Sequence, residues 1–190
     1  IPDYDTNPNQ IIYDNLNGTS ISKGLSANLD VAFYNGLKLM IGGTLQDVSN
    51  TEDGVKERQI LTESYSANWS ISYDIRTWDL TVDYTGNLYG PMRLPTLGDS
   101  DPRRDFSPAW SIQNIQLSYD GFDNIEIYGG VKNLLNWTPA RNNPFVISRG
   151  NDPFENNIQN PQQDLSFDTT YVYTSLQGIR SFLGVRYNLF

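Results

Sequence analysis

The sequence predicts an all-β fold: an antiparallel meander of about seven to eight strands that forms part of a transmembrane β-barrel. Three observations predict it. Apolar and polar residues alternate with a period of two over about a dozen residues, longer than the roughly five or six of an ordinary strand. Charged residues in these stretches keep to the phase opposite the apolar one. Short turns alternate with long irregular segments, as in outer-membrane barrels.

The first predicted hairpin turns at Asn35-Gly36. Residues opposite each other in an antiparallel pair share a face, so a two-residue loop, which sets Tyr34 against Leu37, would mix the two phases. A three-residue loop from Tyr34 to Gly36, with Gly36 left-handed in a G1 bulge, pairs Phe33 with Leu37 instead. The sequence therefore predicts the three-residue loop. The apolar phase of this hairpin consists of Leu29, Val31, Phe33, Leu37, Leu39 and Ile41.

Two further hairpins and a final strand complete seven predicted strands. At Arg76-Thr77 an even loop pairs Ile75 with Trp78 and Ile71 with Val82. At the turn from Asp120 to Asn124 an odd loop pairs Tyr119 with Ile125. Because the short turns share one end, the last strand finishes at that end as well. The apolar phase of these elements includes Trp69, Ile71, Tyr73, Leu80, Val82, Leu117, Ile127, Leu183, Val185 and Tyr187.

The charged residues of the strands indicate what each face meets. All but Lys23 lie opposite the apolar phase, and Lys23 is close to a strand end, where its stem can reach polar surroundings. A soluble sandwich has the same alternation with its apolar face inward. Strand length, aromatic residues near strand ends and the asymmetry of the connections favour the barrel, so we expect the apolar phase to face outer-membrane lipid. The charged set is Asp30, Lys38, Asp74, Asp79, Asp83, Glu126, Lys132, Arg180 and Arg186.

Composition excludes several functions. The 190 residues carry a net charge of −9 and no basic stripe, which argues against a nucleic-acid partner. They contain no cysteine and no histidine, so disulfides, thiolate metal sites and histidine-based catalytic triads are excluded from this segment. We therefore expect no cofactor and no metal site in this segment. The expectation of no catalytic residues, and of a protein that is not an enzyme, comes from the family resemblance described next.

Several segments resemble a known family. They are Gly90-Pro91-Met92-Arg93-Leu94-Pro95, followed by Asp101-Pro102-Arg103-Arg104 and Ser107-Pro108, then Ile115-Gln116-Leu117, Tyr128-Gly129-Gly130-Val131-Lys132-Asn133-Leu134-Leu135-Asn136 and Gly184-Val185-Arg186-Tyr187. Together they resemble the carboxyl-terminal part of TonB-dependent outer-membrane receptors of the siderophore, haem or cobalamin type. The resemblance implies a barrel of 22 strands with a plugged lumen, of which residues 1–190 supply about the last third.

The resemblance also implies the function and its partners. Such a receptor lies in the cell outer membrane and imports a scarce nutrient with TonB-derived energy. The partners expected are membrane lipid, the plug and remaining strands of the same receptor, a small-molecule ligand, and TonB, which contacts an amino-terminal part. Neither the plug nor the TonB-contacting motif has a counterpart in these residues.

Ligand-binding candidates lie in three predicted long loops, 46–62, 91–108 and 137–177. Guanidinium groups pair with oxygen anions, so arginines there can contact an anionic ligand such as a ferric chelate. The alternative, which we favour for each one, is pairing with nearby Asp99, Asp101, Asp105 or Asp152. Trp137 can stack on a ligand or pack the loop itself. The arginine candidates are Arg93, Arg103, Arg104, Arg141 and Arg149.

Two other functions remain open at this point. A self-contained small outer-membrane barrel, acting as an adhesin or an enzyme, needs an even strand count and a closed ring of hydrogen bonds. A soluble carbohydrate-binding β-sandwich needs the apolar phases buried against a second sheet.

Overall fold

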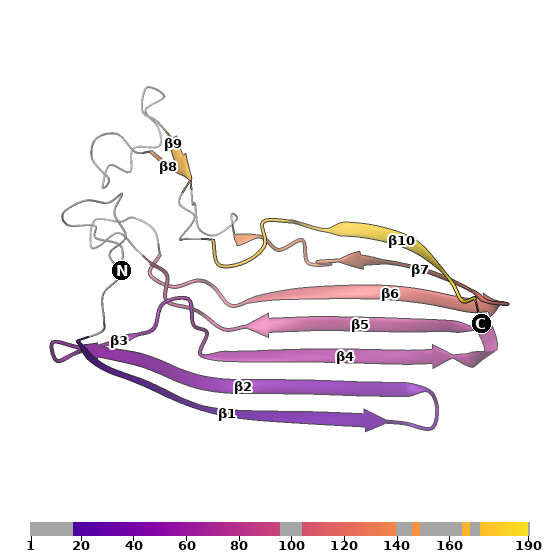
Figure 1. Ribbon diagram of the computed structural model, residues 1–190, viewed down its shortest axis with the longest axis horizontal. Coiled ribbons are helices and arrows are strands. Elements are labelled where there is room, and N and C mark those ends of the chain that lie inside the picture. The colour runs from indigo at the N-terminus through magenta and orange to yellow at the C-terminus, as the bar shows by residue number, and fades with distance from the viewer. Residues whose placement is uncertain (1–16, 96–103, 140–145, 149–164, 168–171, 190) are drawn as a thin grey trace.

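The computed structural model describes residues 17–95, 104–139, 146–148, 165–167 and 172–189. Seven strands follow one another across a single antiparallel sheet (Figure 1). A short strand pairs with β2, and two more form a separate sheet. Among the described residues, no helix is long and apolar enough to cross a membrane. The seven strands are β1 (Gly18–Ala32), β2 (Leu37–Glu52), β4 (Tyr65–Ile75), β5 (Leu80–Tyr89), β6 (Trp110–Phe122), β7 (Ile125–Lys132) and β10 (Arg180–Tyr187); the others are β3 (Val55–Arg58), β8 (Val146–Ser148) and β9 (Leu165–Phe167).

The short turns lie at one end of the sheet and the long connections at the other, and β10 ends beside the short turns (Figure 1). These features were predicted. The first predicted long loop, residues 46–62, is wrong in part, because β2 continues to Glu52 and β3 follows. Residues Gln46 to Glu52, all polar except Val48, pair with Gly24 to Gly18, so the main-chain ladder extends beyond the apolar stretch.

The first turn has the predicted geometry. Phe33 N–H donates to the Leu37 carbonyl at 2.8 Å, which closes a three-residue loop. Gly36 has φ +88°, in the left-handed region where glycine meets no Cβ penalty. Beyond the turn, Val31 lies opposite Leu39 and Leu29 opposite Ile41. The predicted register is therefore confirmed.

The predicted register of the second hairpin is wrong by two residues. Arg76–Trp78 forms a 3-10 turn, and Asp79 closes it in a left-handed conformation with φ 49°. The loop thus has four residues, and Ile75 pairs with Leu80 rather than Trp78. Ile71 likewise pairs with Tyr84 instead of Val82. The loop is even, as predicted, so apolar residues still meet apolar residues.

The predicted register of the third hairpin is also wrong by two residues. Tyr119 pairs with Ile127, and Phe122 pairs with Ile125 across an irregularity between Tyr119 and Phe122. The turn itself is only Asp123-Asn124, because Asn124 adopts φ 61° and lets β6 continue to Phe122. A β-bulge absorbs the one extra residue of β6 and keeps the apolar phases on one face.

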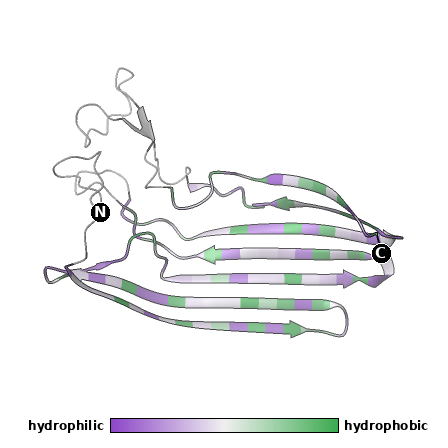
Figure 2. Cartoon of the chain, in the orientation of Figure 1, coloured by the Kyte–Doolittle hydropathy of each residue, from purple (hydrophilic) through white to green (hydrophobic). Residues whose placement is uncertain are grey.

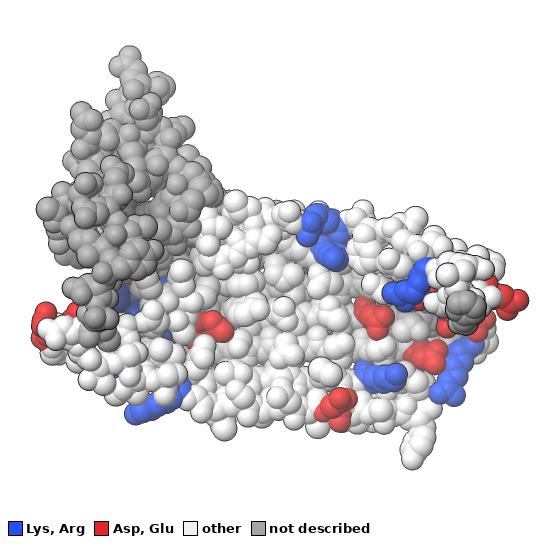
Figure 3. All heavy atoms as spheres, viewed as in Figure 1, with Lys and Arg blue, Asp and Glu red and all other residues white. Residues whose placement is uncertain are grey.

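The sheet has almost no apolar core. The buried hydrophobic residues of the described part are Met92, Leu94 and Trp110, all in or beside the long connections. On the apolar phase Ile41 is 44% exposed and Leu183 is 82% exposed, so no second described sheet covers them. Hydropathy alternates along the strands (Figure 2), and one face carries acidic and basic side chains over the strands (Figure 3).

Two glycines on the polar face make room for aromatic rings on β7 and β10. Tyr128 lies opposite Gly184, and Phe182 lies opposite Gly130. A Cβ at either glycine would collide with the facing ring, and at Gly130 also with the carbonyl oxygen of Ile115. The rings therefore lie across the glycine backbone, a known way of stabilising glycine in strands.

The close approach at Gly130 leads to a testable prediction. Replacing Gly130 by Ala forces the β6 backbone or the Phe182 ring to move, and we expect a loss of about 1 to 3 kcal/mol of stability. Gly43→Ala is the matched control, since the nearest atom to its Cβ is 3.9 Å away. Denaturant titrations of the full-length protein compare the two; equal stability would contradict the packing described.

Candidate functional site

Four aromatic side chains gather at the loop end of the polar face, and we call them the aromatic cluster: Tyr89, Trp110, Trp137 and Tyr173. Tyr89 and Trp110 are cross-strand partners on β5 and β6. Trp110 stacks on Tyr89 with ring centroids 4.3 Å apart and on Trp137 at 5.1 Å. Tyr173 approaches Trp137 at 6.1 Å. The cluster thus joins the two ends of the connection between β7 and β10.

Asn133 ties the same connection together through its side chain. Its Nδ2 donates to the carbonyls of Trp137 (2.8 Å) and Gln177 (3.1 Å), and its Oδ1 accepts from Trp137 N–H at 2.9 Å. The residue is 5% exposed and has φ 55°, a conformation that asparagine tolerates better than most residues. Ile179 N–H also donates a hydrogen bond to the Asn136 Oδ1 at 3.0 Å. Both asparagines belong to the segment that carried the family resemblance.

The predicted arginine candidates are only partly placed. Arg93 donates to a Glu57 carboxylate oxygen at 2.7 Å and to the Arg58 carbonyl at 3.2 Å. It is therefore paired, but with a partner on β3 rather than with one of the nearby aspartates named by the sequence. Arg104 is exposed, while Arg103, Arg141 and Arg149 lie outside the described residues. Trp137 is half-buried in the aromatic cluster, and its contact with a ligand stays a prediction.

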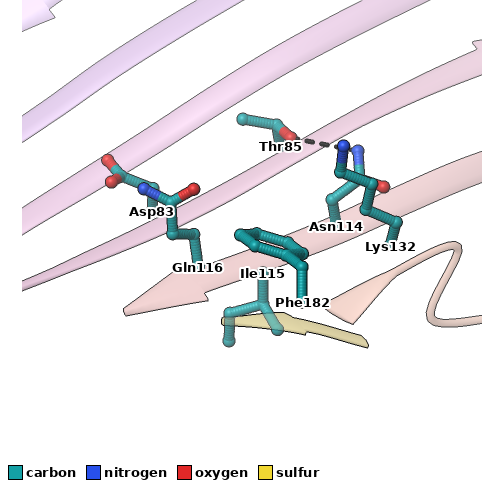
Figure 4. A pocket seen from close by; sticks show the side chains of 7 residues that line it. All are labelled: Asp83, Thr85, Asn114, Ile115, Gln116, Lys132 and Phe182. Carbon is teal, nitrogen blue, oxygen red and sulfur yellow. Dashed lines mark hydrogen bonds between the residues drawn. The ribbon is translucent and has the colours of Figure 1, made fainter. Parts of the chain in front are cut away.

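A pocket on the polar face was not predicted from the sequence. It has a volume of about 230 Å³ and lies over β5, β6, β7 and β10 (Figure 4). Lys132 and Asp83 supply opposite charges, and the Lys132 ammonium lies 5.3 Å from the centre of the Phe182 ring. Asn114 donates to the Thr85 hydroxyl, and the Ile115 side chain points away from the others (Figure 4). This chemistry suits hydrogen bonding and stacking.

A larger hollow of about 630 Å³ adjoins it toward the short turns. Asp83, Asp120 and Glu126 contribute carboxylates, and Arg186 pairs with Glu126 while lying 5.5 Å from the Tyr128 ring. Both hollows could have been located from the sequence by aligning the polar phases of the four neighbouring strands β5, β6, β7 and β10. Together they make the polar face a hydrogen-bonding wall.

Comparison with known proteins identifies the fold. No protein-family model and no curated protein matches this chain. Solved structures do: the ferric-catecholate import receptor Fiu of E. coli K12 has TM-score 0.54 and 16% identity over 63% of this chain and 17% of that chain. The ferric enterobactin receptor PfeA of Pseudomonas aeruginosa has TM-score 0.53 and 16% identity over 87% of this chain and 22% of that chain.

A second structure of PfeA, in complex with BCV-L6, has TM-score 0.52, 16% identity and the same coverage. This chain spans only about a fifth of the length of these receptors. The likeness establishes the fold. The chain is an open antiparallel meander built like one portion of these receptors.

The Asn133 side chain provides the test of the loop-end site. In Asn133→Gly the residue can still adopt the left-handed conformation without strain, but the three side-chain hydrogen bonds are lost. We expect about 1 to 3 kcal/mol of destabilisation. Hydrogen exchange at Trp137 N–H, which loses its acceptor, should accelerate. Asn124→Gly is the control, since Asn124 also has positive φ, at the opposite end of the sheet. Similar exchange rates of Trp137 N–H in the two variants would show that the Asn133 side chain does not hold this connection in place.

Proposed function

We propose that this chain is the carboxyl-terminal part of the wall of an outer-membrane active-transport receptor. The receptor would import a scarce nutrient, such as a ferric siderophore, haem or a cobalamin-like compound, with TonB-derived energy. Plug, remaining strands and TonB contact would lie in other parts of the same receptor. The solved structures with this fold, named as receptors for ferric-catecholate import and for ferric enterobactin, support this proposal.

The observation that supports a membrane location is that the centre of the apolar stretch is displaced along the strands from one strand to the next. Leu29, at the centre of the apolar stretch of β1, aligns through Ile41, Trp69 and Gly86 with Gln113 on β6. The apolar stretch of β6 is instead centred on Leu117, four residues further along. Over four strand-to-strand steps the shift is thus about one residue per step.

Such a displacement of the apolar stretch is expected when the strands are tilted relative to the normal of a flat lipid layer. With roughly 3.3 Å per residue and about 4.8 Å between strands, one residue per step gives a tilt of roughly 35°. Membrane β-barrels have tilts of about 35 to 45°. From Leu25 to Phe33 the apolar stretch of β1 then covers roughly 22 Å of depth, close to the about 25 Å of a barrel's apolar band. A tilted crossing of lipid accounts for both quantities.

The two alternative functions have less support. A sandwich requires a second sheet over the apolar phase, and the described residues provide none. A self-contained barrel requires its first and last strands to pair, whereas β1 and β10 stand at opposite edges of the described sheet. Unpaired edges cannot stay in hydrocarbon, so pairing with further wall strands is the more economical arrangement.

Transport by the complete receptor is the direct test. Cells that lack the full-length protein should take up less radioactive iron from a ferric catecholate at limiting iron, and cells that also lack TonB should show the same deficit. Haem and cobalamin serve as parallel substrates that separate the three nutrient classes. Unchanged uptake of all three would contradict the import function.

Two adjacent residues allow a sharp test of the lipid-facing assignment. Ile41 and Met40 are 44% and 47% exposed but lie on opposite faces of β2. We expect Ile41→Lys to destabilise the membrane-inserted protein by about 2 to 4 kcal/mol, and Met40→Lys to have little effect, because only the first places a charge in lipid. Folded yield and unfolding in lipid vesicles measure the difference. Two equally mild variants would mean that both faces meet water.

A further inference from the structure

The charged residues on the apolar phase of the seven-strand path occur at one place. Within the described strands of that path they are Lys23 on β1 and Asp47 on β2, which are direct cross-strand partners. The neighbouring pair on the same face is Leu25 and Leu45, which are 71% and 62% exposed. The charges therefore begin immediately where the apolar stretch ends, on the long-connection side.

Strand β3 adds two more cations to the same face. Lys56 and Arg58 pair in register with Thr51 and Ser49 of β2, which share the phase of Asp47. The Lys56 ammonium lies 3.9 Å from a carboxylate oxygen of Asp47, and both side chains are 64% exposed. We call Lys23, Asp47, Lys56 and Arg58 the outer basic patch.

The patch has an excess of positive charge. Asp47 is its single carboxylate and is paired with Lys56. Neither Lys23 nor Arg58 has an ion pair with another described residue, and the Arg58 Nε is buried without a hydrogen-bond partner there. By contrast, on the polar face Arg186 is paired with Glu126. The uncompensated charge thus faces away from the polar wall.

We propose that the outer basic patch binds the phosphate groups of lipid head groups in the leaflet next to the long connections. This rests on the proposed function, which places the apolar stretch in lipid. Lysine stems extend along apolar surface and deliver the ammonium to head-group depth. Charge-assisted bonds from lysine and arginine to phosphate are strong, and each basic residue near an anionic lipid surface adds attraction. Phosphate supplies the anion that the protein lacks here.

Titration of the purified full-length protein in neutral detergent with bisphosphorylated lipid A tests the proposal. The variant Lys23→Gln/Lys56→Gln lowers the patch from an excess of two positive charges to none, and we expect lipid A binding to weaken about ten- to thirty-fold at low salt. The control Lys38→Gln/Arg180→Gln removes two cations from the polar face, outside both hollows, and should bind lipid A like the unmodified protein. Dephosphorylated lipid A should not distinguish the variants.

The outcomes separate three cases. Equal lipid A affinity for the patch variant and the unmodified protein overturns the proposal. Complete competition by millimolar inorganic phosphate also overturns it, because the patch would then take a solute anion rather than lipid. Failure of the unmodified protein to insert into neutral vesicles would instead refute the membrane assignment itself, independently of these lysines.

Discussion

The main-chain ladder between long antiparallel strands is the constraint on which the rest of this structure depends. A globular domain buries side chains, but this sheet has only a few buried apolar residues, and these lie in or beside its connections. Its order comes from cross-strand pairing, with β1 matched to β2 along its whole length. Where no water is present, every backbone donor and acceptor needs such a partner. This explains why both long faces can remain uncovered by other described elements.

The two ends of the sheet differ because they are built from different interactions. At the short turns, left-handed residues such as Gly36, Asp79 and Asn124 reverse the chain within a few residues. At the other end, side chains distant in sequence hold the connections: Asn133 bonds Gln177, and Arg93 bonds Glu57. Loops anchored to a rigid wall are a common location for recognition. On the polar phase of β5 and β6, the aromatic Tyr89 and Trp110 lie nearest these connections, and Thr85 and Asn114 of the pocket follow them along the strands.

Much of the fold followed from the sequence because a period of two assigns every residue to a face. Gly36 fixed the first turn, but Asp79 and Asn124 are left-handed without being glycine, so the next two registers were wrong by two residues. Each residue was nevertheless assigned to the correct face, because both register errors were of two residues. The extension of β2 to Glu52 was missed because its residues, apart from Val48, are polar and show no apolar alternation. The Asn133 clamp and the Arg93 partner depend on residues 44 and 36 positions away, which local pattern does not reveal.

The central claim is that one face of the sheet meets lipid and the other meets water. Spin labels placed singly at residues 28, 29, 30 and 31 of the full-length protein in lipid vesicles test it most directly. Accessibility to oxygen, which concentrates in lipid, should peak at 29 and 31, and accessibility to a water-soluble nickel complex should peak at 28 and 30. If the nickel complex reaches all four positions equally, both faces are in water and the account is wrong.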